Sequence, residues 1–159
     1  MSCWTDQWKD FVTRTSYEIY DQILMYSGYP GEILAKISSF ISPGATLLDI
    51  GAGTGAFAIP LSRKTSRTIA IDPSEYQLQI LSEKARQEGL INIVTINREW
   101  KDVLPSEINA VGVSDVDISR EHASKSHNSA VDYSLAAYSL FDEDIEHFLT
   151  KMIDVTKRE

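Results

Sequence analysis

The stretch LLDIGAGTGAFAIPL, residues 47–61, constrains the fold of this chain more than any other segment. An apolar run ends in Asp49, and glycine then recurs at every second position as Gly51, Gly53 and Gly55. A short apolar run bounded by glycine is typical of a buried strand. A strand that enters a helix through glycines places backbone N–H groups at the positive end of that helix. Because glycine has no Cβ, a ligand can approach this main chain closely, and the pattern predicts an anion-binding turn.

The segments around this turn alternate between two periodicities. Helical patterns follow the glycine turn and recur at 73–89 and 142–158, with Ser74 as an N-cap and Gly89 as a left-handed C-cap. Short runs rich in apolar or β-branched residues predict strands at 45–50, 67–72, 91–97 and 132–140. Strands that alternate with helices predict parallel βαβ units, so the fold class is α/β. In the last helix the expected buried face consists of Ile145, Phe148, Leu149, Met152 and Ile153.

Two further regions lie outside this alternating pattern of strands and helices. Amphipathic segments precede the first strand, so we expect N-terminal helices in residues 1–42 and a nucleotide-binding domain in 43–159, joined as one compact unit. The stretch 103–130 is long for a connection inside a compact domain. Its part 110–119, AVGVSDVDIS, alternates in polarity and is a second candidate for the fourth strand, beside 132–140.

A carboxylate after the second strand narrows the class of ligand. Asp72 lies about 20 residues beyond the glycines, where an acid binds ribose hydroxyls in nucleotide-binding βαβ units. Gly51, Gly53 and Ala56 also satisfy the dinucleotide pattern, so NAD stays an alternative. A pyrophosphate gains nothing from a carboxylate as close as Asp49. A ligand that carries both an ammonium and a carboxylate does gain binding energy from Asp49. S-adenosylmethionine has such an amino-acid end.

Four segments resemble the class I S-adenosylmethionine-dependent methyltransferases. LLDIGAGTGAF is similar to the first motif of that family, and TIAIDPSEYQL to the second. TINREWKDV resembles the region after the third strand, and DYSLAAYSLFDEDIEHFLTKM resembles the fourth strand and its helix. The resemblance implies a Rossmann-like three-layer sandwich with a mainly parallel sheet in the order 3-2-1-4. Since we find about four strands and the family has seven, we expect the C-terminal part of the domain to be lacking.

The resemblance also implies S-adenosyl-L-methionine as cofactor and a set of residues that hold it. We expect no metal site, because neither a cysteine nor an H-E-x-x-H pattern accompanies His122 and His127. We name no catalytic residue because positioning of an activated methyl can suffice. Trp100 has an alternative role as a packing residue. The implied contacts are Asp49, Gly51, Ala52, Gly53 and Gly55 to the methionine moiety, Asp72 to the ribose, Pro73, Glu99 and Trp100 to the adenine, and Ala137 and Tyr138 near the sulfonium.

The function that these features imply is methyl transfer from the sulfonium to an unidentified acceptor. The alternatives are a non-catalytic or partner-dependent fragment of a methyltransferase and an NAD-binding fragment. An uncovered fourth strand invites pairing with a second copy or with a partner chain. Whether this chain acts alone as an enzyme stays open at this point.

Charge and composition set the remaining expectations. The formal net charge of -8 argues against binding to nucleic acid or to an anionic membrane, and it favours a small-molecule acceptor. No apolar run approaches the roughly 20 residues that span a bilayer. Cys3 is the single cysteine, which excludes an intramolecular disulfide and predicts a cytoplasmic protein.

Overall fold

The computed structural model describes residues 14–112, 131–137 and 144–157 of the 159-residue chain. Its centre is a parallel sheet of four strands in the order β3-β2-β1-β4. The strands are β1 (Thr46–Ile50), β2 (Arg67–Asp72), β3 (Ile93–Asn97) and β4 (Tyr133–Ala136). The α/β class and the strand order predicted from the sequence are confirmed.

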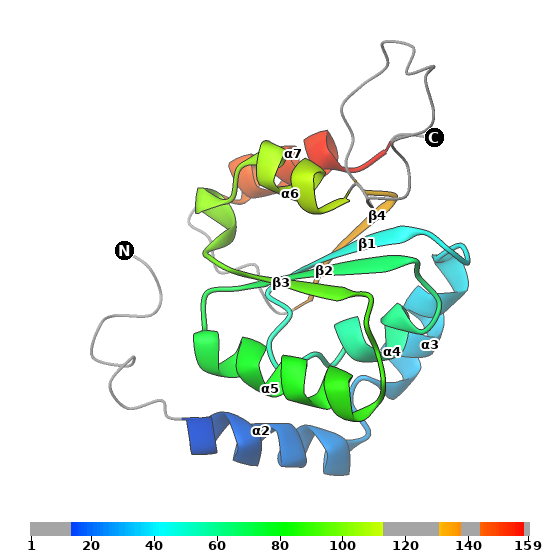
Figure 1. The fold of residues 1–159 in the computed structure, drawn as a ribbon, viewed down its shortest axis with the longest axis vertical. Coiled ribbons are helices and arrows are strands. Elements are labelled where there is room, and N and C mark those ends of the chain that lie inside the picture. Colours follow the sequence, from blue (N-terminus) through cyan, green and yellow to red (C-terminus); the bar gives the residue numbers. More distant parts are fainter. Residues whose placement is uncertain (1–13, 113–130, 138–143, 158–159) are drawn as a thin grey trace.

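Helices cover both faces of this sheet (Figure 1). On one face lie α6 (Pro105–Gly112) and α7 (Ile145–Val155), and on the other lie α3 (Gly31–Phe40), α4 (Ala58–Ser62) and α5 (Glu75–Gln87). The helix α2 (Arg14–Ser27) packs outside α5, and a short 3-10 helix, Trp100–Asp102, follows β3. No helix within the described ranges is both long and apolar enough to cross a bilayer.

The two central strands carry apolar side chains at most of their buried positions because both of their faces are covered. Leu48 and Ile50 pack with Ile69 and Ile71 in the cluster that includes residues of α6 and α7. Side chains of alternate residues, such as Leu47, face the helices on the opposite side. The same alternation directs Asp49 and Asp72 to one common face, where the functional groups discussed below are found.

The ends of α5 follow their sequence signals. The hydroxyl of Ser74 accepts a hydrogen bond from the backbone N–H of Gln77 at 3.4 Å. Gly89 has a φ of 69°, and the N–H of Leu90 returns to the carbonyl of Ala85 at 2.9 Å. These bonds are those of an N-cap and of a left-handed C-cap, so both predictions are confirmed.

Two predictions about the C-terminal half are wrong. The alternative strand at 110–119 fails because residues 110–112 belong to α6, while the rest of that segment lies outside the described residues. In α7 the buried side chains are Phe148 and Val155, with Met152 partly buried against the same cluster. The expected buried face mixed two sides of the helix, since Ile145, Leu149 and Ile153 are 51%, 43% and 52% exposed.

Candidate active site

The residues singled out from the sequence gather where β4, β1 and β2 end. Ile50 is paired with Ile71 on one side and with Ala136 on the other, so the glycine turn leaves the sheet between two neighbouring strand ends. Asp72 is the last residue of β2, and Ala137 directly follows β4. In open α/β sheets, ligands bind in the crevice outside the carboxyl ends of the strands, which is this position.

The glycine turn, residues 51–55, has a backbone that other residues adopt poorly. Gly51, Gly53 and Gly55 have φ values of 73°, 57° and 91°, which is the left-handed region. A Cβ on Gly53 would lie 2.9 Å from Oε1 of Gln77. A Cβ on Gly55 would lie 2.9 Å from the side chain of Ile59 and 3.0 Å from Cγ of Leu81. Gly55 therefore allows the turn to pack closely against α4 and α5.

Four N–H groups of the glycine turn already have acceptors inside the protein. Those of Gly51 and Ala52 donate to the carbonyl of Ile71 at 2.8 and 3.0 Å. The N–H of Gly53 donates to Oδ2 of Asp72 at 2.9 Å, and that of Gly55 donates to the carbonyl of Ala52 at 3.0 Å. The sequence predicted that turn amides bind a ligand anion. These four instead hold the turn in shape, and a ligand gains them only by displacing an internal acceptor.

The carboxylate of Asp72 is fixed from two sides. Oδ1 accepts the N–H of Ser74 at 2.8 Å, and Oδ2 accepts the N–H of Gly53. The side-chain amide of Asn97 donates to the carbonyl of Asp72 at 3.1 Å. Burial raises the pKa of Asp72, while the two N–H donors act to lower it. Because a carboxylate offers about four acceptor positions, Asp72 has capacity left for hydroxyl donors of a ligand.

Asp49 is a buried carboxylate that forms no ion pair with any residue of the described ranges. It is 2% exposed, and among the described residues its Oδ2 has no hydrogen-bond partner. Burial first and then the charge of Asp72 raise the pKa of Asp49 to about 7, against the lowering effect of the Ala58 N–H. An unsatisfied buried oxygen of this kind calls for an explanation. A cationic group placed beside Asp49 would satisfy it, and hydroxyls placed beside Asp72 would satisfy that carboxylate.

Sequence reasoning missed three residues that act on the turn together, Asp21, Thr54 and Lys84, which we call the loop triad. The hydroxyl of Thr54 donates to Oδ1 of Asp21 at 2.5 Å. Nζ of Lys84 lies 2.5 Å from Oδ2 of Asp21 and 3.3 Å from the carbonyl oxygen of Thr54. The three residues come from α2, the turn and α5. No local pattern could have related them, because Asp21 and Lys84 are 63 positions apart.

The residues expected around the adenine are dispersed. The ring of Trp100 is buried against Phe148, with centroids 6.0 Å apart, and Nζ of Lys151 lies 4.4 Å from the Trp100 ring centroid. This placement, with Trp100 only 6% exposed, favours the packing role. Glu99 pairs with Lys101 at 2.8 Å. Pro73 is exposed beside Asp72, whereas Tyr138 lies outside the described residues.

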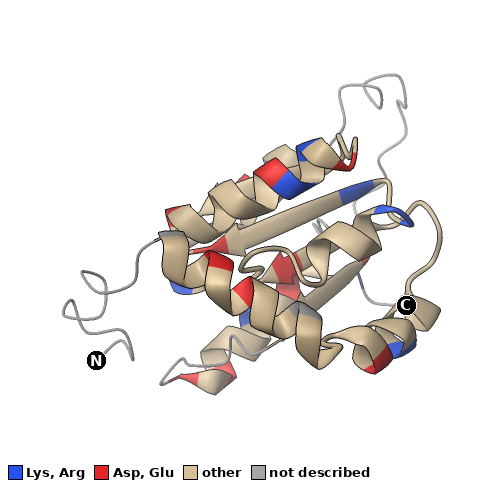
Figure 2. Cartoon of the chain, turned by 90° about the horizontal axis from the view of Figure 1, so that it is seen from below, with Lys and Arg blue, Asp and Glu red and all other residues tan. Residues whose placement is uncertain are grey.

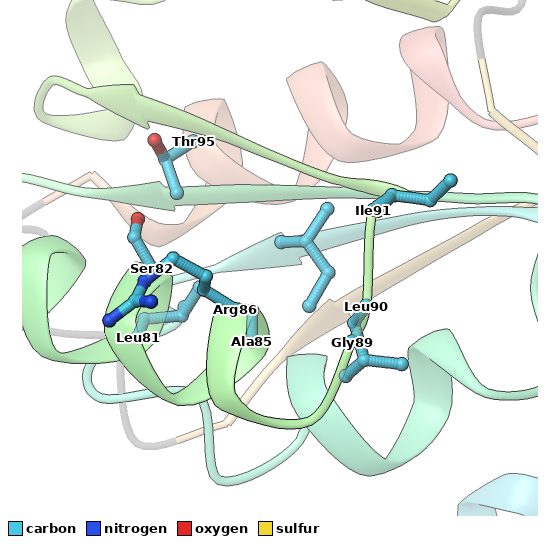
Figure 3. A pocket seen from close by; sticks show the side chains of 9 residues that line it. Leu81, Ser82, Ala85, Arg86, Gly89, Leu90, Ile91 and Thr95 are labelled. Atoms are coloured by element: carbon cyan, nitrogen blue, oxygen red, sulfur yellow. The ribbon is translucent and has the colours of Figure 1, made fainter.

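A hollow elsewhere on the surface is separate from this site. A cavity of about 220 Å³ lies between α5 and β3, with Ser82, Arg86 and Thr95 among its lining residues (Figure 3). Neither Asp49 nor Asp72 lines it. Since it opens beside the outer strand rather than at the strand ends, we do not assign it to the site.

Comparison with known proteins identifies relatives of this chain. Residues 47–114 match the family model described as a methyltransferase domain. A ribosomal RNA small subunit methyltransferase A of Dichelobacter nodosus is 30% identical over 84 residues, which are 51% of this chain and 31% of that protein. A ribosomal protein L11 methyltransferase of Thermotoga maritima is 32% identical over 84 residues, which are 52% of this chain and 29% of that protein. The chain thus spans about a third of the length of these relatives.

A solved structure agrees in fold. The crystal structure of an S-adenosylmethionine-dependent methyltransferase from Aquifex aeolicus superposes with a TM-score of 0.62 and 21% identity, over 92% of this chain and 68% of that one. At this level of identity the likeness establishes the fold alone. It agrees with the Rossmann-like architecture.

The predicted acceptor class is wrong. The net charge favoured a small molecule and argued against nucleic acid, whereas the names of the two relatives give a ribosomal RNA and a ribosomal protein as substrates. The physical reason is that a net charge of -8 is a sum over the chain and does not describe local surfaces. Figure 2 shows basic residues interspersed with acidic ones on the helices.

Proposed function

We propose that this chain, whose residues 47–114 match the model of a methyltransferase domain, is part of a class I S-adenosylmethionine-dependent methyltransferase and binds S-adenosylmethionine where β1, β2 and β4 end. The observation that carries the proposal is the pair of buried carboxylates beside the glycine turn. Asp49 has an oxygen without a partner among the described residues, and Asp72 is fixed by Gly53 and Ser74. The cofactor offers a cation to the first carboxylate and two hydroxyls to the second.

The residues present fit this cofactor better than they fit NAD. An ammonium beside Asp49 neutralises a carboxylate that burial and Asp72 destabilise. The pyrophosphate of NAD would instead bring negative charge next to Asp49, which costs free energy in a buried site. Because Gly53 lacks a Cβ and has a φ of 57°, the main chain of the turn is bare at this position, which supports close approach of a ligand.

We assign each remaining residue a positioning role. Asp72 orients the ribose, exposed Pro73 lies beside the adenine, and Ala137 is near the sulfonium end, at the tip of β4. Tyr138 and Glu99 stay predictions for the same pocket. When bound, S-adenosylmethionine supplies a methyl group that the sulfonium has already activated. The chain's own contribution is to fix that methyl relative to an acceptor, and this step requires no proton transfer by Asp49 or Asp72.

For the whole protein we propose a macromolecular acceptor of the ribosome. The names of the two curated relatives support this class. The test is to incubate the full-length protein with methyl-labelled S-adenosylmethionine and ribosomal subunits from cells that lack its gene, followed by separation of RNA from protein. We expect label in one of these two fractions. Transfer to small molecules alone would contradict the proposal.

The Asp72→Ala protein should bind S-adenosylhomocysteine about 30-fold more weakly, because charge-assisted hydrogen bonds to the ribose contribute about 1.5–3 kcal/mol. Isothermal titration calorimetry measures this change. Asp132→Ala is the matched control, since its carboxylate also accepts a backbone N–H, from Thr46 at 2.7 Å, but lies at the opposite end of β1. Equal affinity of the Asp72→Ala and Asp132→Ala proteins would remove Asp72 from the site, and binding of NAD alone would reject the proposed cofactor.

A further inference from the structure

We infer that Asp21 is a positioning residue for cofactor binding, through which helix α2 holds the glycine turn in its binding shape. This inference rests on the proposed function of the turn and adds a residue that no motif of the methyltransferase domain match contains, because the match begins at residue 47. Asp21 lies on a separate helix and acts through Thr54 and Lys84 rather than on the cofactor itself.

In the loop triad, Asp21 and Lys84 hold two polar groups of Thr54, its hydroxyl and its carbonyl oxygen. Thr54 stands between Gly53 and Gly55, the two residues whose left-handed backbone gives the turn its path. Its hydroxyl is bound to Asp21, and its carbonyl oxygen is within 3.3 Å of Nζ of Lys84. With only 5% of its surface exposed, Thr54 cannot replace these partners with water without moving the turn.

The polar contacts of the triad also attach α2 to the glycine turn and to α5. The side chains of Asp21 and Lys84 are 14% and 30% exposed, so their ion pair is partly shielded from solvent. The apolar residues Ile19 and Ile23 of the same helix are 53% and 58% exposed, so they contribute little burial. Loss of the Asp21 charge should therefore release α2 and the turn together.

A movement of the glycine turn would act directly on the groups that bind the ligand. Gly53 precedes Thr54, and its N–H is the donor that fixes Oδ2 of Asp72. A turn that moves at Thr54 shifts the donor that orients the ribose-binding carboxylate, and it also shifts the main chain beside Asp49. The loss of affinity should consequently exceed what a distant surface substitution causes.

The test compares isosteric variants in the full chain. We expect Asp21→Asn and Thr54→Val to bind S-adenosylhomocysteine about 10-fold more weakly, the loss expected for one charge-assisted hydrogen bond. Thr54→Ser, which keeps the hydroxyl, should have an affinity for S-adenosylhomocysteine within about twofold of that of the wild type. Glu88→Gln is the control, because it breaks the exposed ion pair with Arg63, which shares no residue with the loop triad.

A second measurement needs no ligand. Amide hydrogen exchange of residues 51–57 in the ligand-free protein should accelerate in Asp21→Asn and Thr54→Val and stay unchanged in Glu88→Gln. Unchanged exchange in both triad variants, or unchanged affinity, would overturn the role of Asp21. Failure of the proposed function gives a different result, in which the wild type itself does not bind S-adenosylhomocysteine while the exchange comparison still reports on the turn.

Discussion

The Gly55→Ala protein is expected to lose about 4 kcal/mol of unfolding free energy, since a single methyl group adds backbone strain and core overpacking at one position. Gly55 has a φ of 91°, which an L-residue adopts poorly. The added Cβ would lie 2.9 Å from Cδ1 and Cγ1 of Ile59 and 3.0 Å from Cγ of Leu81. Leu81 is fully buried, so it cannot move away without disturbing the core.

The Gly44→Ala protein separates the effect of backbone strain from the effect of overpacking. Gly44 also has a positive φ, of 80°, but nothing lies within 4 Å of the position that an added methyl group would take. Backbone strain alone should cost that protein about 1 kcal/mol. Urea unfolding followed by circular dichroism measures both values. If the two alanine variants prove equally stable, the close packing of Gly55 against α4 and α5 is not a constraint on the fold.

The Asp49→Asn protein should gain stability relative to the wild type as the pH rises. The pKa of Asp49 is raised from 3.8 to about 7 in the folded state, so the folded protein binds a proton more tightly than the unfolded chain does. The stability from this proton is fully present below pH 4 and is lost as the pH rises through 7. At 1.36 kcal/mol per pKa unit, the difference between the two proteins should change by about 4 kcal/mol between pH 4 and pH 8.

The same substitution should weaken cofactor binding, because an amide does not attract the ammonium of S-adenosylmethionine. In the wild type, affinity should rise with pH up to about 7 and then level off, since Asp49 must lose its proton to pair with a cation. In Asp49→Asn this dependence should be absent. Calorimetric titrations at pH 5.5, 7 and 8.5 provide the comparison. A wild-type affinity independent of pH would show that Asp49 does not contact the charged end of the ligand.

Local signals in the sequence predicted the central fold well. The second strand was placed at 67–72, and the structure has β2 over Arg67–Asp72. Ser74 and Gly89 marked the ends of α5 because capping depends on residues within one turn of the helix. Asp49 and Asp72 were brought together by a rule of parallel sheets, since the carboxyl ends of neighbouring strands share one edge.

Features that depend on tertiary contacts could not be predicted in this way. The exposed positions of α7 look as apolar as the buried ones, so periodicity alone did not select the face of Phe148 and Val155. Trp100 follows β3 as an adenine-binding residue would, yet its ring enters the core beside Phe148. The loop triad joins three elements that are distant in sequence, so no local pattern marks its members as a group.

The internal hydrogen bonds of the glycine turn affect how fast a ligand can bind. Because the amides of Gly51, Ala52, Gly53 and Gly55 are satisfied without a ligand, ordering of this backbone is completed during folding. Binding then requires little rearrangement, and rigid receptors of this kind associate at rates set by diffusion and orientation. Under the proposed function, substitutions at side chains such as Asp49 would change the residence time of the cofactor and leave its rate of capture constant.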